Sequence, residues 1–341
     1  MQTMAMWRRW LAAMGMVGVV CLTGVAWGEP PLRGMTVTCF RWGPGEWDGP
    51  TMWPTLDRLA ELGVNAVATH PYARIRSDGE VSHRPAVQDA SSLLPMRLAA
   101  KRGQAYLLKP HLAYWGSRFS WRGEITFDRE EDWARFFAGY RDFIVHHARL
   151  AEAGGAAWFA VGTELEGTTH RPEWAAILDE VRAVYSGRVT YAANWDTLDR
   201  VPFWGRLDAV GVQFYYPLTD AADPTDEQLR RAVEARLDEA VAFAKAQGKP
   251  LMLTELGYAP HDTAASRPWD DAGDETEAGF VLSRRCLDAA LAAVMARDGS
   301  EVVGVFLWKW FPTPREFRDE FALQYPEAIE VIAGRWAVSA E

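Results

Sequence analysis

Short apolar runs alternate with longer amphipathic segments along almost the whole chain. The runs are rich in Val, Leu and aromatic residues and are bounded by Gly, Pro or polar residues, which is typical of strands buried on both faces. We predict eight such strands, over 35–40, 64–69, 105–108, 157–161, 189–193, 207–214, 251–256 and 302–307. Strands buried on both faces indicate a parallel sheet, because crossover helices then cover each face.

The segments between the strands place apolar residues at helical spacing and end at Gly or Pro. The clearest helix begins with a capping box at Thr225 and Gln228 and ends before Gly248. Other helices are expected over 54–62, 93–102, 132–153, 172–185, 276–297 and 326–333. An open parallel sheet usually has a glycine-rich phosphate loop after its first strand, and Gly43-Pro44-Gly45 is not such a loop. The alternation therefore predicts a (β/α)8 TIM barrel in a single domain.

The N-terminus has the features of an export signal. Arg8-Arg9 precede an apolar run over 11–25, and Ala26-Trp27-Gly28 is a small-x-small cleavage site. We therefore expect residues 1–28 to be a signal peptide and residues 29–341 to be the catalytic barrel domain. The mature chain should be exported to the periplasm or the extracellular space without a membrane anchor, and the pattern leaves the Sec and twin-arginine routes open.

Charge and cysteine content narrow the classes of partner. The formal net charge is −10, and loss of the two arginines of the signal makes the mature chain more acidic, which disfavours nucleic acid and anionic membranes. Cys21 fits a lipid-attachment site poorly, and Cys39 and Cys286 lie in apolar segments, so we interpret these last two as buried thiols. We find no metal-ligand spacing and no cofactor motif. We therefore expect a monomer without metal or cofactor.

Two of the predicted strands end in a glutamate. The fourth leads into Gly162-Thr163-Glu164-Leu165, and the seventh ends in Thr254-Glu255-Leu256. A buried carboxylate is costly to desolvate unless it has a partner, and catalytic groups of a barrel lie at the C-terminal ends of its strands. Strands four and seven lie on opposite sides of the barrel mouth, so the two carboxylates can approach the roughly 5–5.5 Å that retaining glycoside hydrolysis requires.

Such a reaction needs one protonated carboxyl group and one ionised carboxylate, whose pKa values are pushed apart by their mutual charge. The structural alternative is a pair of rim glutamates that form salt bridges with Arg or Lys. Glu166 shares strand parity with Glu164 and is a rival acid on that strand.

Aromatic and polar residues near other strand ends complete the candidate site. The chain has 17 Trp, and the flat indole is well suited to stacking on sugars. Trp308 or Trp310 can form the floor under the sugar, and shared strand parity lets both point the same way. Tyr215 or Tyr216 can donate a hydrogen bond to the nucleophile. Residues that can bind hydroxyls or neutralise the acidic mouth are His111, Lys109 and Arg122. The candidate substrate-binding residues are Trp42, His111, Trp121, Arg122, Asn194, Tyr215, Tyr216, Trp308 and Trp310.

These segments resemble glycoside hydrolase family 113, whose characterised members include β-mannanases. The resemblance spans about residues 34–312 and is carried by Leu107-Leu108-Lys109-Pro110-His111 with Trp121-Arg122-Gly123, Gly162-Thr163-Glu164-Leu165, Tyr191-Ala192-Ala193-Asn194-Trp195-Asp196 and Leu253-Thr254-Glu255-Leu256-Gly257-Tyr258.

The resemblance implies a role for each glutamate, with Glu164 as the acid/base and Glu255 as the nucleophile. It also implies membership of the clan of retaining (β/α)8 glycoside hydrolases. In that clan an Asn commonly precedes the acid/base and binds the sugar 2-hydroxyl, whereas this chain has Thr163 there. Asn194 is our candidate for the missing contact.

The sequence thus predicts an exported retaining glycoside hydrolase whose substrate is a β-linked polysaccharide or oligosaccharide, with β-mannan as one option. A barrel that binds carbohydrate without catalysis is the alternative, but binding alone needs no matched pair of acids. A barrel hydrolase that uses a metal is a third interpretation. The sugar, the linkage and the choice between endo and exo action stay open.

Overall fold

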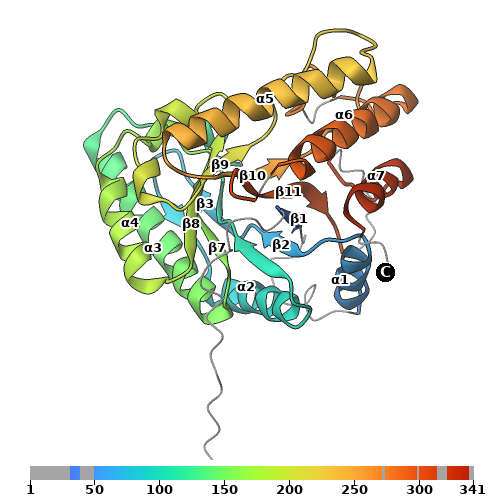
Figure 1. The fold of residues 1–341 in the computed structure, drawn as a ribbon. Coiled ribbons are helices and arrows are strands. Elements are labelled where there is room, and N and C mark those ends of the chain that lie inside the picture. Colours follow the sequence, from blue (N-terminus) through green and yellow to red (C-terminus); the bar gives the residue numbers. More distant parts are fainter. Residues whose placement is uncertain (1–30, 39–49, 271–272, 298, 313–320, 338–341) are drawn as a thin grey trace, which may run out of the picture.

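The chain folds into a closed barrel of eight parallel strands (Figure 1). The computed structural model describes residues 31–38, 50–270, 273–297, 299–312 and 321–337. The barrel strands are β1 (Leu32–Val37), β2 (Ala66–Thr69), β5 (Ala105–Leu108), β7 (Trp158–Thr163), β8 (Arg188–Asn194), β9 (Val210–Gln213), β10 (Leu251–Leu256) and β11 (Val302–Trp310). They follow one another around the barrel as β1-β11-β10-β9-β8-β7-β5-β2. The predicted (β/α)8 fold is confirmed.

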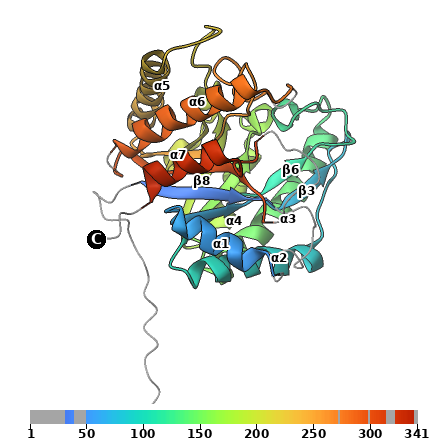
Figure 2. The same ribbon diagram turned by 90° about the vertical axis from the view of Figure 1, so that its right-hand side faces the viewer.

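Helices form a ring outside the barrel (Figures 1 and 2). They are α1 (Met52–Glu61), α2 (Pro85–Ala100), α3 (Glu130–Gly154), α4 (Glu173–Val184), α5 (Asp226–Ala246), α6 (Glu277–Met295) and α7 (Pro326–Trp336). The capping box that starts α5 is present, because the Thr225 side chain accepts from the backbone N–H of Gln228 and the Gln228 side chain accepts from that of Thr225. Two short 3₁₀ helices, η4 (Leu198–Arg200) and η5 (Trp204–Arg206), connect β8 to β9.

The strands bury both of their faces, as their apolar sequences predict. One set of strand residues packs with the helices in the main core, and a second set fills the barrel interior, with the two sets alternating along β2 and β7. This interior cluster consists of Ala66, Ala68, Leu107, Trp158, Ala160, Ala209, Met252, Val303 and Phe306. Gly34 lies so close to the Phe306 ring that a β-carbon there would clash with it. The closed barrel therefore presents its strand ends as a rigid rim.

A second, three-stranded sheet was not predicted from the sequence. It has the order β4-β3-β6, with β3 (Tyr72–Ile75), β4 (Val81–Ser82) and β6 (His111–Ala113). Strands β3 and β6 follow β2 and β5 after connections that contain Pro71 and Pro110. These strands are short and mix polar with apolar residues, so periodicity alone does not reveal them. The small sheet extends the rim above β2 and β5.

Helix α2 also begins earlier than predicted, at Pro85 instead of residue 93. Its first turns carry Ala86, Gln88, Asp89 and Ala90, which lack an apolar stripe, so the periodic pattern starts later in the sequence than the helix does. Pro85 suits the first turn, because proline lacks the N–H that a helix leaves unpaired there.

Several predictions about the termini and the cysteines lie partly outside the described residues. The signal peptide, Cys39 and Trp42 all fall in undescribed ranges. Cys286 is buried as a free thiol, as predicted, and burial raises its pKa to about 12. Within the described ranges, every helix is too short or too polar to cross a bilayer.

Candidate active site

The two glutamates lie at the same end of the barrel. Glu164 directly follows β7, and Glu255 is the penultimate residue of β10. Each is bound to the neighbouring strand, because the Glu164 N–H donates to the Ala192 carbonyl at 2.8 Å and the Phe214 N–H donates to the Glu255 carbonyl at 2.8 Å. Glu255 also contributes to the electrostatic field that raises the pKa of Glu164. The two carboxylates therefore share one electrostatic environment.

Glu164 has a left-handed backbone, with φ at 49°. Among the described residues it is the one non-glycine residue with positive φ. Such a conformation is strained for a residue with a side chain, and strain of this kind concentrates at functional sites. The local sequence supports it: Gly162 leaves room for the Tyr191 ring, and the Tyr191 hydroxyl accepts from the N–H of Leu165 at 2.7 Å.

Glu255 has a positive partner and a hydroxyl donor. The Lys109 ammonium binds Oε1 directly and also donates to the Thr254 carbonyl at 3.1 Å. The Tyr215 hydroxyl donates to Oε2 at 3.0 Å. The carboxylate therefore has a positive counter-charge on one oxygen and a hydroxyl donor on the other. His111 Nε2 is 3.8 Å from Oε1, too far for a hydrogen bond.

Lys109 is fully buried beneath this carboxylate. Burial lowers its pKa, and the neighbouring Glu255 raises it in part, so that the pKa ends below the ordinary value of a lysine. A buried ion pair of this kind is retained only when each charge keeps its partner. Lys109 and Glu255 therefore form one unit, and removal of either one exposes the other to the full cost of burial.

Glu164 has a different environment from Glu255. Its Oε2 accepts from Arg122 Nη1 at 2.8 Å. Burial raises the pKa of Glu164 to about 7, because the desolvation of the carboxylate outweighs the opposing positive charge of Arg122. A carboxyl group with a pKa near 7 can both give and take a proton at neutral pH.

Aromatic rings cover the site beside Glu255. Trp308 is half-buried and stacks with His111 at 6.0 Å between ring centroids, and its ring lies 5.1 Å from Lys109 Nζ. His70 packs against Trp308 at 4.9 Å. Burial and the nearby positive charges hold the pKa values of His70 and His111 well below 6.5, so both rings are neutral. Trp308 therefore lies next to the pair of Lys109 and Glu255.

The structure separates several candidate residues that the sequence could not rank. Trp310 is buried in the main core instead of lying beside Trp308, which corrects the expectation of a shared orientation from strand parity. Tyr216 packs against Phe214 and Trp195, whereas Tyr215 contacts Glu255.

Asn194 and Trp121 lie at the rim, and in the described structure neither forms a hydrogen bond with Glu164 or Glu255. Asn194 ends β8, and its side-chain amide donates to Asp196 at 2.8 Å. Trp121 is half-buried just before the 3₁₀ turn η2 (Arg122–Glu124), and its ring covers Gly123. Trp42 lies outside the described residues.

Glu166 is held in the loop structure. Its Oε1 accepts from the Asn194 N–H at 2.8 Å and from the Thr197 hydroxyl at 3.1 Å. These bonds connect the loop after β7 to the loop after β8, so Glu166 has a structural task that Glu164 lacks. Thr163, which stands where the clan has Asn, donates from its hydroxyl to the Pro110 carbonyl at 3.4 Å.

Sequence reasoning missed His70 and Tyr72 as site residues. Tyr72 packs edge-on against His70 at 5.2 Å and against His111 at 5.5 Å. Burial raises its pKa to about 12, with Glu255 and Glu164 among the groups that act on it. Both residues follow β2, so the rule that functional groups lie at strand ends was the signal that could have found them. In the part of the chain that the structure describes, no group of three or more His, Cys, Asp or Glu could hold a metal ion.

A family comparison decides what kind of enzyme carries this site. The model of Glycoside Hydrolase Family 113 matches residues 37–322, a range that includes both glutamates, Lys109, Arg122 and Tyr215. The chain belongs to glycoside hydrolase family 113. It is therefore a glycoside hydrolase, as the motifs predicted. A comparison with curated proteins gives no significant match.

Solved structures of family 113 are similar over nearly their whole length. The β-mannanase AaManA from Alicyclobacillus acidocaldarius, in complex with ManMIm, has 26% sequence identity and a TM-score of 0.76, over 90% of this chain and 97% of that chain. A family 113 β-1,4-mannanase has 23% identity and a TM-score of 0.76, over 90% and 99%. A family 5 mannosidase from Rhizomucor miehei, at 11% identity and a TM-score of 0.63 over 91% and 93%, shares the fold.

Proposed function

We propose that this family 113 protein is a retaining glycoside hydrolase that cleaves β-linked mannan or its oligosaccharides. The observation that carries the mechanism is the contrast between the two glutamates. Glu255 is paired with the Lys109 ammonium and accepts a hydrogen bond from Tyr215, whereas burial raises the pKa of Glu164 to about 7. The β-mannanases of similar fold support mannan as the substrate.

The proposed reaction has two steps. The Glu255 carboxylate attacks the anomeric carbon while Glu164 gives its proton to the departing glycosidic oxygen, which forms a glycosyl ester on Glu255. Glu164, now ionised, then takes a proton from a water molecule, whose oxygen attacks the anomeric carbon and releases Glu255. Trp308 supports the sugar from below in both steps.

A substrate screen tests the proposal. We expect kcat/KM on β-1,4-mannan to exceed that on β-glucan and β-xylan by at least about tenfold. A tenfold ratio corresponds to a difference of about 1.4 kcal/mol in activation free energy between the substrates. Sizes of the early products separate endo from exo action. Absence of turnover on every polysaccharide and on aryl glycosides would favour the binding-only barrel, and activity that is lost with a chelator would favour the metal-dependent alternative.

The pH dependence should follow the carboxyl group that acts as the acid. We expect kcat/KM to fall as the pH rises through about 7, because Glu164 loses the proton that the leaving group needs. The positive charge of Arg122 lowers the pKa of Glu164. In Arg122→Met the basic limb of the profile should therefore move to higher pH, by roughly one unit or more.

The matched control for this profile is Arg118→Met, because Arg118 lies on the same loop but is exposed and donates to the Thr126 carbonyl. Its basic limb should coincide with that of the unmodified enzyme. A limb in Arg122→Met that stays in place or moves to lower pH would contradict the assignment of the titrating acid.

Export is a separate part of the proposal. It rests on the charged, apolar and small-residue pattern of residues 1–28, which are outside the described ranges. We expect the mature chain to begin at Glu29 and to be found outside the cytoplasm. N-terminal sequencing of protein from the native host checks this, and an intact start or a lipid on Cys21 would contradict it.

A further inference from the structure

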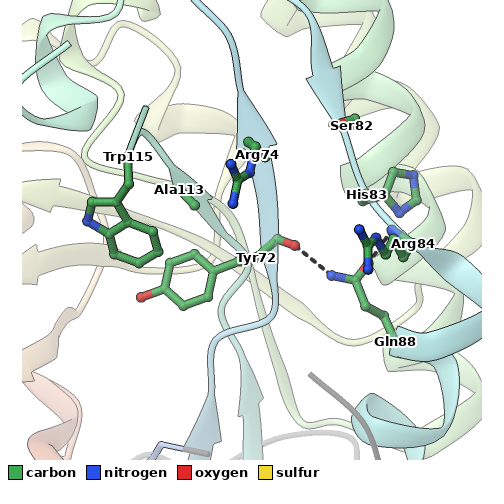
Figure 3. Close-up of a pocket in the computed structure, with 8 residues that line it drawn as sticks. All are labelled: Tyr72, Arg74, Ser82, His83, Arg84, Gln88, Ala113 and Trp115. Atoms are coloured by element: carbon green, nitrogen blue, oxygen red, sulfur yellow. Dashed lines mark hydrogen bonds between the residues drawn. The ribbon is translucent and has the colours of Figure 1, made fainter. Parts of the chain in front are cut away.

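A cavity of about 350 Å³ lies beside the small sheet, next to the active site (Figure 3). Figure 3 shows Tyr72 and Trp115 on one side of the cavity, His83, Arg84 and Gln88 on the other, and Arg74 between them. Gln88 fixes this arrangement, because its amide donates to the Tyr72 carbonyl at 2.5 Å and accepts from the Arg84 N–H at 3.2 Å. These two hydrogen bonds connect β3 to the start of α2 and fix the wall of the cavity.

The lining of this cavity is positively charged in a chain whose net charge is negative. Arg74 and Arg84 are both exposed, and neither guanidinium forms an ion pair or a hydrogen bond with any described residue. No Asp or Glu belongs to the described residues that line the cavity. Arg84 precedes the first turn of α2, where the unpaired N–H groups add partial positive charge. Most of the other described arginines form an ion pair with an acidic side chain, as Arg76 does with Glu80.

His83 adds a buried polar atom without a partner. Its side chain is 5% exposed, and Nε2 is 2.9 Å from Asp142 Oδ2. The other ring nitrogen, Nδ1, is buried and has no hydrogen-bond partner among the described residues. A buried polar group of this kind normally has a partner, from the protein or from a ligand.

The aromatic wall connects the cavity to the catalytic glutamates. Trp115 is 53% exposed and packs against Tyr72 at 5.4 Å between ring centroids. Tyr72 in turn packs against His111, which lies 3.8 Å from Glu255. A glycan that is bound over Trp308 can therefore continue past Tyr72 onto the Trp115 ring, where its next units meet Arg74 and Arg84.

From this arrangement we propose that the cavity binds a sugar unit of the substrate that carries an anionic group, a uronic acid carboxylate, between Arg74 and Arg84 with the ring on Trp115. Arginine forms strong, directional hydrogen bonds with carboxylates, and an exposed indole supplies a flat apolar face. This inference rests on the proposed function, because it specifies a charged sugar unit of the substrate that the active site is proposed to cleave. The enzyme would then prefer acidic β-linked glycans to neutral ones.

The test compares two substrates that differ only in charge. One is a manno-oligosaccharide that carries glucuronic acid, and the other is the same oligosaccharide after chemical reduction of its carboxyl group to an alcohol. We expect the ratio of kcat/KM, acidic over reduced, to be at least about tenfold in the unmodified enzyme, as for a hydrogen bond to a charged group. This ratio should fall to about one in Arg74→Met/Arg84→Met.

Arg97→Met is the matched control. Arg97 is exposed in α2, the helix that Arg84 precedes, and it does not line the cavity. It should keep the full ratio. An unmodified enzyme that treats both substrates alike, or a ratio that survives in the double variant, would overturn the proposal. The single variants should each lose part of the ratio, which guards against an effect of the double change on folding.

Calorimetric titration with the acidic oligosaccharide separates the two proposals, because it needs no turnover. Arginine-dependent binding without hydrolysis of any mannoside would refute the proposed function and leave the cavity assignment intact. Hydrolysis of neutral mannan together with equal binding of both oligosaccharides would refute the cavity assignment and leave the proposed function intact.

A phosphate ester in place of the carboxylate on the same sugar distinguishes carboxylate recognition from general anion binding. Equal or tighter binding of the phosphate would contradict the uronic acid assignment.

Discussion

Glu164→Ala is expected to lose at least about 10³-fold in kcat/KM on mannan, or about 4 kcal/mol, but far less on an aryl glycoside with a good leaving group. A poor leaving group needs the proton of Glu164, whereas a phenolate of low pKa departs without it. Added azide should restore turnover of the aryl substrate, because the small anion attacks the glycosyl ester without a general base, and its product should keep the β configuration.

The partner variant and a control complete this test. Glu255→Ala should be inactive on both substrate types, and any azide product should have the inverted configuration, because azide then takes the place of the missing carboxylate. Glu166→Gln is the matched control, since the amide oxygen can still accept from Asn194 and Thr197. It should lose less than about tenfold. The reverse pattern of azide rescue would show that the assigned roles of Glu164 and Glu255 are swapped. Losses of kcat/KM below about tenfold in both alanine variants would show that these glutamates are structural.

Lys109→Met should have the second largest effect, on stability as well as on activity. The substitution leaves the Glu255 carboxylate buried without its counter-charge, and removal of one member of a buried pair costs about 3–5 kcal/mol. We expect a lower free energy of unfolding at neutral pH, measured by chemical denaturation, and a large loss of kcat.

A double variant distinguishes this electrostatic effect from poor packing of the methionine. In Lys109→Met/Glu255→Gln both charges are absent, so the free energy of unfolding should recover most of what the single variant lost. Lys101→Met is the control for loss of a lysine at the surface, because Lys101 is exposed at the end of α2. Its free energy of unfolding should stay close to that of the unmodified protein. A double variant as unstable as Lys109→Met would show that the lysine stem, and not its charge, matters for folding.

The barrel could be predicted because its signals are local. Each strand is a run of apolar residues before a polar strand end, and the capping box at Thr225 and Gln228 marks α5 directly. Glu164 and Glu255 could be predicted for the same reason, since each follows an apolar run that the barrel geometry brings to one rim.

Other parts of the site depend on contacts between residues far apart in sequence. Lys109 and Glu255 are 146 positions apart, and no pattern in the chain indicates that the lysine is buried under that carboxylate. Strand parity failed for Trp308 and Trp310, because packing at the end of β11 places Trp310 in the core. The small sheet escaped prediction because its strands are too short for a period to be seen.

Both glutamates have basic partners, as the structural alternative expected, so ion pairing alone does not distinguish catalysis from stability. The difference lies in the pKa of Glu164, which stays raised to about 7 despite Arg122, and in its left-handed backbone. A carboxylate that served only to form a salt bridge would be expected to have a lowered pKa. This raised pKa supports the proposed role of Glu164 in proton transfer.

The stereochemistry of the first product tests the central claim most directly. Proton NMR of a β-mannosidic oligosaccharide during its hydrolysis resolves the anomeric signal of the new reducing end before mutarotation. A double displacement through Glu255 predicts that the β anomer appears first and the α anomer grows in later. If the α anomer appears first, the reaction is a single displacement, and the assignment of Glu255 as a nucleophile is wrong.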